Sequence, residues 1–182
     1  GCLGHRGFGV GLRPLPARWG GGYHAGMSPS KKKADRAAYH AVWPTAWGPM
    51  GGVADAEGAL IRVVLPHYQA QDLRELLAWE HPASEANDEP FAELARLALA
   101  YFSAERVDFD GVAVALPSEK SFSGRVLRAA RAIPYGQSVS YGELAKQIDQ
   151  PDAARAVATA MSKNPTPLVV PCHRVRYAGG GA

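Results

Sequence analysis

The sequence is poor in cysteine and has no long hydrophobic run, and each absence excludes a class of protein. Its 182 residues include two cysteines, Cys2 and Cys172, which are too few for a disulfide framework and are typical of a reducing compartment. No stretch approaches the ~18 consecutive apolar residues that a membrane-spanning helix needs. A basic start followed by an apolar segment, the mark of a secretory signal, is also missing. We therefore predict an intracellular protein without a membrane partner, cytoplasmic, or nuclear in a eukaryote.

Charge is scarce overall but unevenly distributed. Hydrophobic residues make up 47% of the chain and charged residues 20%, which excludes global disorder and allows a packed core. The net charge is +3, yet residues 27–118 have a net charge of −5 and residues 119–182 a net charge of +5. A basic C-terminal part favours contact with a polyanion, and the alternative is an uneven surface that has no partner.

The first part of the chain is glycine-rich and has no periodic pattern. A start-like sequence at Met27 is followed by the basic triplet 31–33. We expect residues 1–38 to lie upstream of the fold or to be disordered. Cys2, His5 and His24 in this segment are possible zinc ligands, but they lack the paired spacing of a zinc site, and we predict no metal.

Residues 39–117 have the pattern of a small α/β unit. Alternating and β-branched runs predict strands, and apolar residues at helical spacing predict helices, the second of which has Asn87 or Asp88 as its N-cap. The expected elements are a hairpin within 39–64, helices over 70–79 and 90–102, and a strand over 107–116.

The second half is predominantly helical. Ser140 and Glu143 have the spacing of a capping box, and Pro151 is suited to the first position of the next helix. The two short helices around this break have a helix-turn-helix pattern. The expected elements are helices over 122–133, 141–148 and 151–161, and a buried strand over 168–170.

That strand leads to Cys172, which His173 and Arg174 follow. Neighbouring positive charge lowers the pKa of a thiol, and the thiolate is a strong nucleophile whose proton an adjacent imidazole can accept. Successive residues on a strand point to opposite sides, so Cys172 and His173 need a turn to cooperate. On spacing alone, a buried structural cysteine is the simpler alternative.

Five strings in order give this region a family resemblance. They are Ile133-Pro134-Tyr135-Gly136, Ser140-Tyr141-Gly142-Glu143-Leu144-Ala145, Ala153-Ala154-Arg155-Ala156-Val157, Asn164-Pro165 and Pro171-Cys172-His173-Arg174-Val175. Over residues 119–175 the chain closely resembles the O6-alkylguanine-DNA alkyltransferases, also called methylated-DNA–protein-cysteine methyltransferases, and over 40–118 it resembles them less closely. The resemblance implies an α+β fold: a ribonuclease-H-like α/β domain over 39–117, then a helical, winged-helix-like DNA-binding domain with a helix-turn-helix over 118–182.

The same resemblance implies direct-reversal DNA repair by a single-turnover methyltransferase. The alkyl group of O6-alkylguanine, with O4-alkylthymine as a further candidate substrate, would pass to Cys172, while His173 relays a proton through water. The partner would be double-stranded DNA bound by a monomer, with no cofactor, and the damaged base would be flipped out of the helix. Arg155 would fill the gap in the base stack, and Tyr141 would assist rotation of the nucleotide.

The resemblance also implies supporting roles for other residues. Asn164 would be a hinge, the backbone of Val175 would read the guanine edge, and Tyr177 would hold the substrate oxygen. Met161, Pro167 and Ala156 would shape the pocket and the groove contact by apolar packing.

The C-terminal end departs from the family pattern. Tyr177 comes five residues after Cys172, whereas the family has about thirteen, and a closing helix with a glutamate that orients the histidine does not follow. The expectation is a shortened C-terminus that exposes apolar surface and lowers stability. Three alternatives remain open: a non-catalytic protein that recognises alkyl lesions, an inactive truncated family member, and a helix-turn-helix transcription regulator.

Overall fold

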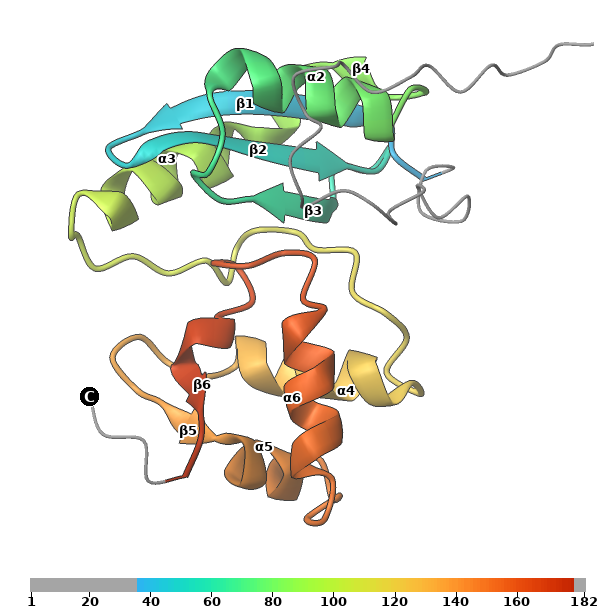
Figure 1. The fold of residues 1–182 in the computed structure, drawn as a ribbon, viewed down its shortest axis with the longest axis vertical. Coiled ribbons are helices and arrows are strands. Elements are labelled where there is room, and N and C mark those ends of the chain that lie inside the picture. Colours follow the sequence, from blue (N-terminus) through green and yellow to red (C-terminus); the bar gives the residue numbers. More distant parts are fainter. Residues whose placement is uncertain (1–35, 179–182) are drawn as a thin grey trace, which may run out of the picture.

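The computed structural model describes residues 36–178, which form the mixed α+β fold expected from the sequence (Figure 1). A four-stranded sheet with two helices forms one part, which we call the sheet part. Three helices and a two-stranded sheet form the other, the helical part. The predictions for residues 1–35, including the zinc ligands considered above, lie outside the described residues. Between residues 36 and 178, no helix has the length and apolar character needed to cross a membrane.

The sheet part is built on a three-stranded meander, to which a short fourth strand is added. The strands are β1 (Tyr39–Thr45), β2 (Gly48–Ala54), β3 (Leu60–Val64) and β4 (Glu85–Ala86). Their order is β3-β2-β1-β4, and only the β1–β4 pair is parallel. The predicted hairpin is therefore confirmed. The fold starts slightly earlier than expected, because Ala37 is buried and Ala38 donates a backbone hydrogen bond to Ala54.

Both predicted helices of this part are present, one on each face of the sheet. They are α2 (Ala70–Glu80) and α3 (Ala92–Phe102), the latter preceded by the 3-10 turn η2 (Glu89–Phe91). Asp88 holds the N-cap position of η2 without a side-chain bond, whereas Asn87 Oδ1 accepts a hydrogen bond from Glu89 N at 3.0 Å.

Two adjacent glycines in β2 allow both helices to approach the sheet closely. Successive residues of a strand face opposite sides. A Cβ on Gly51 would lie 2.9 Å from Leu77 of α2, and a Cβ on Gly52 would lie 2.8 Å from the Phe91 ring. Larger residues at these positions would push the helices away from the sheet.

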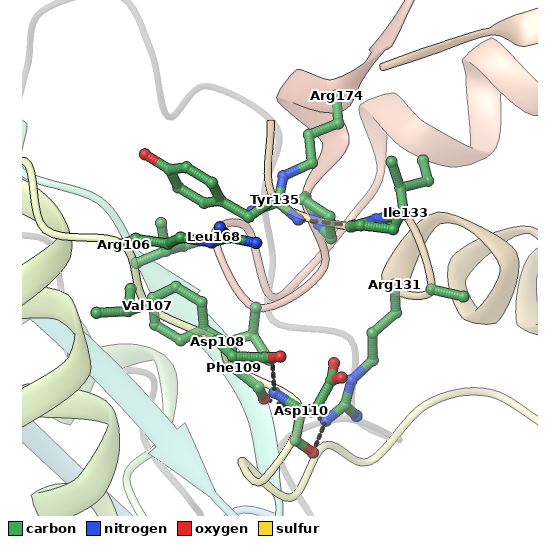
Figure 2. A pocket seen from close by; sticks show the side chains of 14 residues that line it. Arg106, Val107, Asp108, Phe109, Asp110, Arg131, Ile133, Tyr135, Leu168 and Arg174 are labelled. Atoms are coloured by element: carbon green, nitrogen blue, oxygen red, sulfur yellow. Dashed lines mark hydrogen bonds between the residues drawn. The ribbon is translucent and has the colours of Figure 1, made fainter. Parts of the chain in front are cut away.

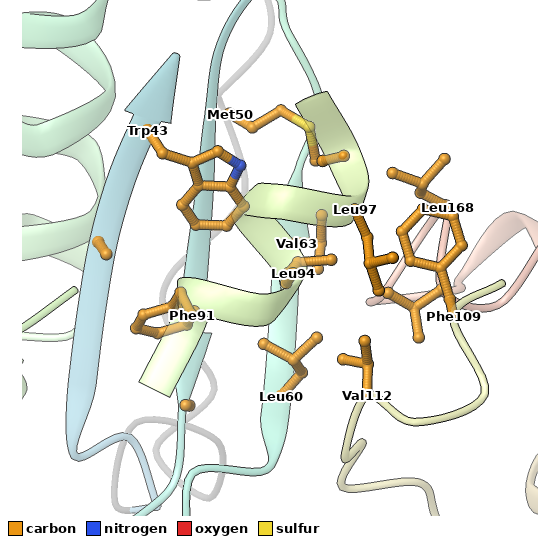
Figure 3. Packing of buried hydrophobic residues seen from close by; sticks show 14 residues of the cluster. Trp43, Met50, Leu60, Val63, Phe91, Leu94, Leu97, Phe109, Val112 and Leu168 are labelled. Carbon is orange, nitrogen blue, oxygen red and sulfur yellow. The ribbon is translucent and has the colours of Figure 1, made fainter. Parts of the chain in front are cut away.

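The core on the α3 face also receives a residue from the helical part. Figure 3 shows Leu168 beside Phe109 and Val112, at the end of a cluster that includes Trp43 and Phe91. Leu168 and Val169 are buried there, and Val63 N donates a hydrogen bond to Pro165 O at 2.8 Å. These contacts join the loop before Cys172 to the sheet part.

The predicted strand over 107–116 is wrong. Only one bridge joins this segment to a strand within residues 36–178, between Leu60 and Val114. The segment turns at Phe109 to Val112, where Val112 N bonds to Phe109 O, because both side chains enter the core. The alternating apolar pattern thus reflects a loop that buries two side chains.

The helical part contains three short helices around one apolar cluster. Its elements are α4 (Phe122–Arg131), β5 (Val139–Ser140), α5 (Tyr141–Gln147), α6 (Ala154–Ser162), the 3-10 turn η3 (Cys172–Arg174) and β6 (Val175–Arg176). The capping box is confirmed, since Ser140 Oγ accepts from Glu143 N and Glu143 accepts from Ser140 N. The parallel pairing of β5 with β6 was not predicted.

Two predicted elements of this part need correction. Pro151 does not begin a helix: it lies in a turn, and α6 begins at Ala154 because Ala153 N bonds back to Gln150 O. Residues 168–170 do not form a strand. Val170 N bonds to Thr166 O, and Leu168 has a φ of 76°, so this apolar run is a tight turn.

Candidate active site

Cys172 lies on a tight turn, which is the geometry that Cys172 and His173 need in order to cooperate. It is the first residue of η3 and is half-buried at the edge of the helical core. Its backbone N donates to Val170 O at 2.9 Å, and Arg174 N donates to Pro171 O at 2.9 Å. These bonds hold together residues 171–175, which we call the reactive turn because they carry the candidate nucleophile Cys172. The thiol of Cys172 is free.

The turn continues directly into β6, which anchors its far end. Val175 is buried and pairs with Val139 of β5. The backbone of Val175 is therefore held in a fixed register beside the N-terminus of α5.

His173 lies on the side of the turn that faces the sheet part. Its side chain is exposed, and its Nε2 lies 3.4 Å from the hydroxyl of Tyr101, at the end of α3. The two rings are 6.4 Å apart. Partial shielding from water lowers the pKa of His173 below its ordinary value of 6.5, and repulsion by Arg174 lowers it further. The imidazole is thus biased toward its neutral form, which can accept a proton.

Arg174 fixes the turn to the end of α4. Its Nη1 donates to Ile133 O at 2.7 Å, and its guanidinium carbon lies 5.5 Å from the ring centre of Tyr135. Arg106, from the loop after α3, lies 5.9 Å from the same ring centre. Figure 2 shows these side chains at one end of a cavity of about 370 Å³, with Arg131 and Asp110 at the other. The cavity lies between the two parts, directly behind the reactive turn.

Asn164 connects the end of α6 to the segment that precedes Cys172. Its Nδ2 donates to Val170 O at 2.8 Å, and its Oδ1 accepts from Thr166 N at 3.1 Å. Thr166 is fully buried. Asn164 therefore holds the 164–170 turn closed, and Pro167 lies half-buried within it.

Arg155 and Ala156 lie in the first turn of α6, and both are exposed. Among the interactions of the described chain, the Arg155 side chain has no hydrogen bond, ion pair or ring contact. Met161, at the other end of the helix, is buried in the helical core. Arg155 and Ala156 are therefore accessible to a ligand, whereas Met161 packs inside the protein.

Tyr141 and Tyr177 form an aromatic pair next to the reactive turn. Tyr141 is the first residue of α5 and is half-buried, and Tyr177 is 74% exposed. Their ring centroids are 5.0 Å apart in an edge-to-face arrangement. The structure thus brings together two residues that the sequence places 36 positions apart.

Three residues of this region were not predicted as site residues: Tyr101, Arg106 and Tyr135. Tyr101 is 72 positions from His173, and no motif links them. Tyr135 belongs to a string that we used only for the resemblance. No cluster of three or more potential metal ligands lies within residues 36–178.

The chain is similar in sequence and in structure to proteins of one family. A family model described as "6-O-methylguanine DNA methyltransferase, DNA binding domain" matches residues 121–182. The methylated-DNA–protein-cysteine methyltransferase of Methanosarcina acetivorans is 46% identical over 94 residues, which cover 52% of this chain and 59% of that protein. The matched region thus spans less than two thirds of this curated relative.

Two solved structures extend the similarity to most of the chain. The crystal structure of Mycobacterium tuberculosis O6-methylguanine methyltransferase has a TM-score of 0.62 and 32% identity, and the match covers 78% of this chain and 80% of that one. A structure from the same organism in complex with DNA has a TM-score of 0.63 and 31% identity, with 79% and 81% covered. Because the similarity spans both parts at this level of identity, the chain belongs to the O6-methylguanine methyltransferase family.

Proposed function

We propose that this chain repairs alkylated DNA by transferring the alkyl group of O6-alkylguanine to Sγ of Cys172. The observation that carries the proposal is the position of Cys172: a free, half-buried thiol on a tight turn, immediately followed by an imidazole biased toward its neutral form. A family relative whose structure contains DNA supports the same substrate class.

The chemistry we propose is one displacement with balanced atoms. His173 takes the thiol proton, directly or through water, and the thiolate attacks the alkyl carbon. The carbon–oxygen bond breaks with its electron pair on O6, a thioether forms at Cys172, and guanine takes up one proton. No cofactor is needed, and each molecule acts once because the thioether is stable.

We propose that the two parts of the fold are two domains with different roles. Residues 39–117 would form a ribonuclease-H-like domain, and residues 118–182 a DNA-binding domain in which α5 and α6 act as a helix-turn-helix. A mixed sheet covered on both faces and two short helices packed together support this assignment. In this arrangement Arg155 would enter the base stack, and Tyr141 would assist rotation of the nucleotide.

Unneutralised charge on the helical part supports a DNA partner. The exposed cations between residues 118 and 178 are Lys120, Arg125, Lys146, Arg155, Lys163 and Arg176, none of which has a salt bridge within residues 36–178. Such groups bind phosphates by releasing counterions, so affinity should fall steeply as salt concentration rises. We propose that the monomer is the active form and that Asn164, Val175, Ala156, Pro167, Met161 and Tyr177 serve the supporting roles described above.

Intact-mass spectrometry after incubation with a duplex that contains one O6-methylguanine tests the proposal. We expect the protein to gain the mass of one CH2 group, which peptide mapping places on Cys172. Cys172→Ser should gain nothing, and a duplex with unmodified guanine serves as the matched control. Binding to the lesion without transfer would overturn the proposal in favour of a recognition protein, and neither binding nor transfer would indicate an inactive family member.

A further inference from the structure

Tyr101 reaches the reactive turn from the other part of the molecule. It lies in the last turn of α3, whose inner face is anchored in the sheet core by Leu94, Leu97 and Ala98. Its hydroxyl lies 3.4 Å from His173 Nε2. This is a long hydrogen bond, of a kind that is common in catalytic sites without a bound ligand.

The Tyr101 ring is held in place on two sides. It packs edge-on against Phe102, with ring centroids 5.6 Å apart, and against Phe109, with centroids 5.9 Å apart. Phe109 is buried in the same core as α3. The hydroxyl therefore has a fixed position. The side chain of His173 is exposed, and within residues 36–178 its ring makes no hydrogen bond or aromatic contact other than those with Tyr101.

We propose that Tyr101 is a positioning residue for His173: its hydroxyl accepts a hydrogen bond from Nε2–H and leaves Nδ1 free to take the Cys172 proton. The inference rests on the proposed alkyl transfer. It assigns the orientation of His173, the base in that reaction, to Tyr101 of the sheet part. A base must keep one ring nitrogen unprotonated, and the hydrogen bond made by the other nitrogen selects that tautomer.

The same bond favours proton transfer. Once His173 has taken the proton, its Nε2–H belongs to an imidazolium, and a hydrogen bond from a charged donor is roughly twice as strong as a neutral one. Tyr101 therefore stabilises the charged product of this step more than the starting state. Arg174 on the same turn opposes that charge, so the hydroxyl offsets part of its repulsion.

Tyr101→Phe tests the proposal, because it keeps the ring and its packing and removes only the hydroxyl. We expect the pKa of His173, followed by NMR of its imidazole, to fall by about 0.5 unit, a size suited to a long hydrogen bond at a partly exposed site. Tyr39→Phe is the matched control: Tyr39 is a half-buried tyrosine of β1 that has no side-chain hydrogen bond among the described residues, and it should leave this pKa unchanged. The His173→Gln spectrum assigns the resonance.

The rate of alkyl transfer provides the second readout. In the parent chain the single-turnover rate should rise with pH as His173 loses its proton. In Tyr101→Phe we expect a maximal rate about tenfold lower, with the rising limb displaced to lower pH. A lower rate without displacement of the limb, or an unchanged or raised pKa of His173, would overturn the proposal. If the parent transfers no alkyl group, the proposed function fails, but the NMR titration still decides whether Tyr101 acts on His173.

Discussion

Asn164→Ala should loosen the reactive turn and destabilise the protein by an amount that follows from its hydrogen bonds. The amide donates to Val170 O at 2.8 Å and accepts from Thr166 N at 3.1 Å. Two net hydrogen bonds are worth about 2 kcal/mol, and a buried donor left without a partner adds about 1–3 kcal/mol. Thr166 is fully buried and loses this acceptor, whereas Val170 O keeps Cys172 N. We expect a loss of about 3–5 kcal/mol in the free energy of unfolding.

Urea unfolding measures this loss, and hydrogen exchange measures its location. The backbone amide of Cys172 should exchange faster in Asn164→Ala, because the acceptor Val170 O is no longer held in place. Ser162→Ala is the control: its hydroxyl bonds to Thr159 O on the exposed side of α6, and its removal should cost little. A loss below about 0.5 kcal/mol for Asn164→Ala, or an equal loss for Ser162→Ala, would refute the reasoning.

Two further predictions concern the sheet part. Gly52→Ala should lower the free energy of unfolding by about 1–3 kcal/mol, because the new Cβ would lie 2.8 Å from the Phe91 ring and 3.0 Å from Trp43. Thermal unfolding measures this loss. Gly111→Ala is the control, and it should leave the stability nearly unchanged because its Cβ meets open space. Burial lowers the pKa of His40 below its ordinary value of 6.5 in the folded protein. As pH drops below 6.5, the imidazole of His40 is therefore protonated more readily in the unfolded chain than in the folded one, and the free energy of unfolding should fall. His40→Gln should reduce this slope, and an unchanged slope would show that His40 does not contribute to it.

Local signals in the sequence predicted most helices correctly, because each such signal depends on neighbours along the chain. The capping box at Ser140 and the helical spacing over 70–79 are examples, since their hydrogen bonds and apolar faces lie within one or two turns. The start of α6 was misplaced because a local hydrogen bond, Ala153 N to Gln150 O, forms a turn at Pro151. The other two errors arose where a distant part of the protein decides the local conformation. The apolar run 168–170 is a turn because Leu168 and Val169 are buried in the core of the sheet part.

In the candidate site, too, local sequence patterns predicted some features, and only the fold provided the others. The sequence by itself pointed to the family, to Cys172 as the candidate nucleophile, to its neighbour His173 and to the need for a turn between them, because these depend on short strings of residue types. Only the tertiary structure decided what surrounds that string: Tyr101 beside His173, Arg106 near Tyr135, and Tyr177 against Tyr141. These contacts join residues 29 to 72 positions apart. The first two contacts form because burial of apolar side chains packs the sheet part against the helical part, and the third forms where β6 pairs with β5. No local pattern encodes either arrangement.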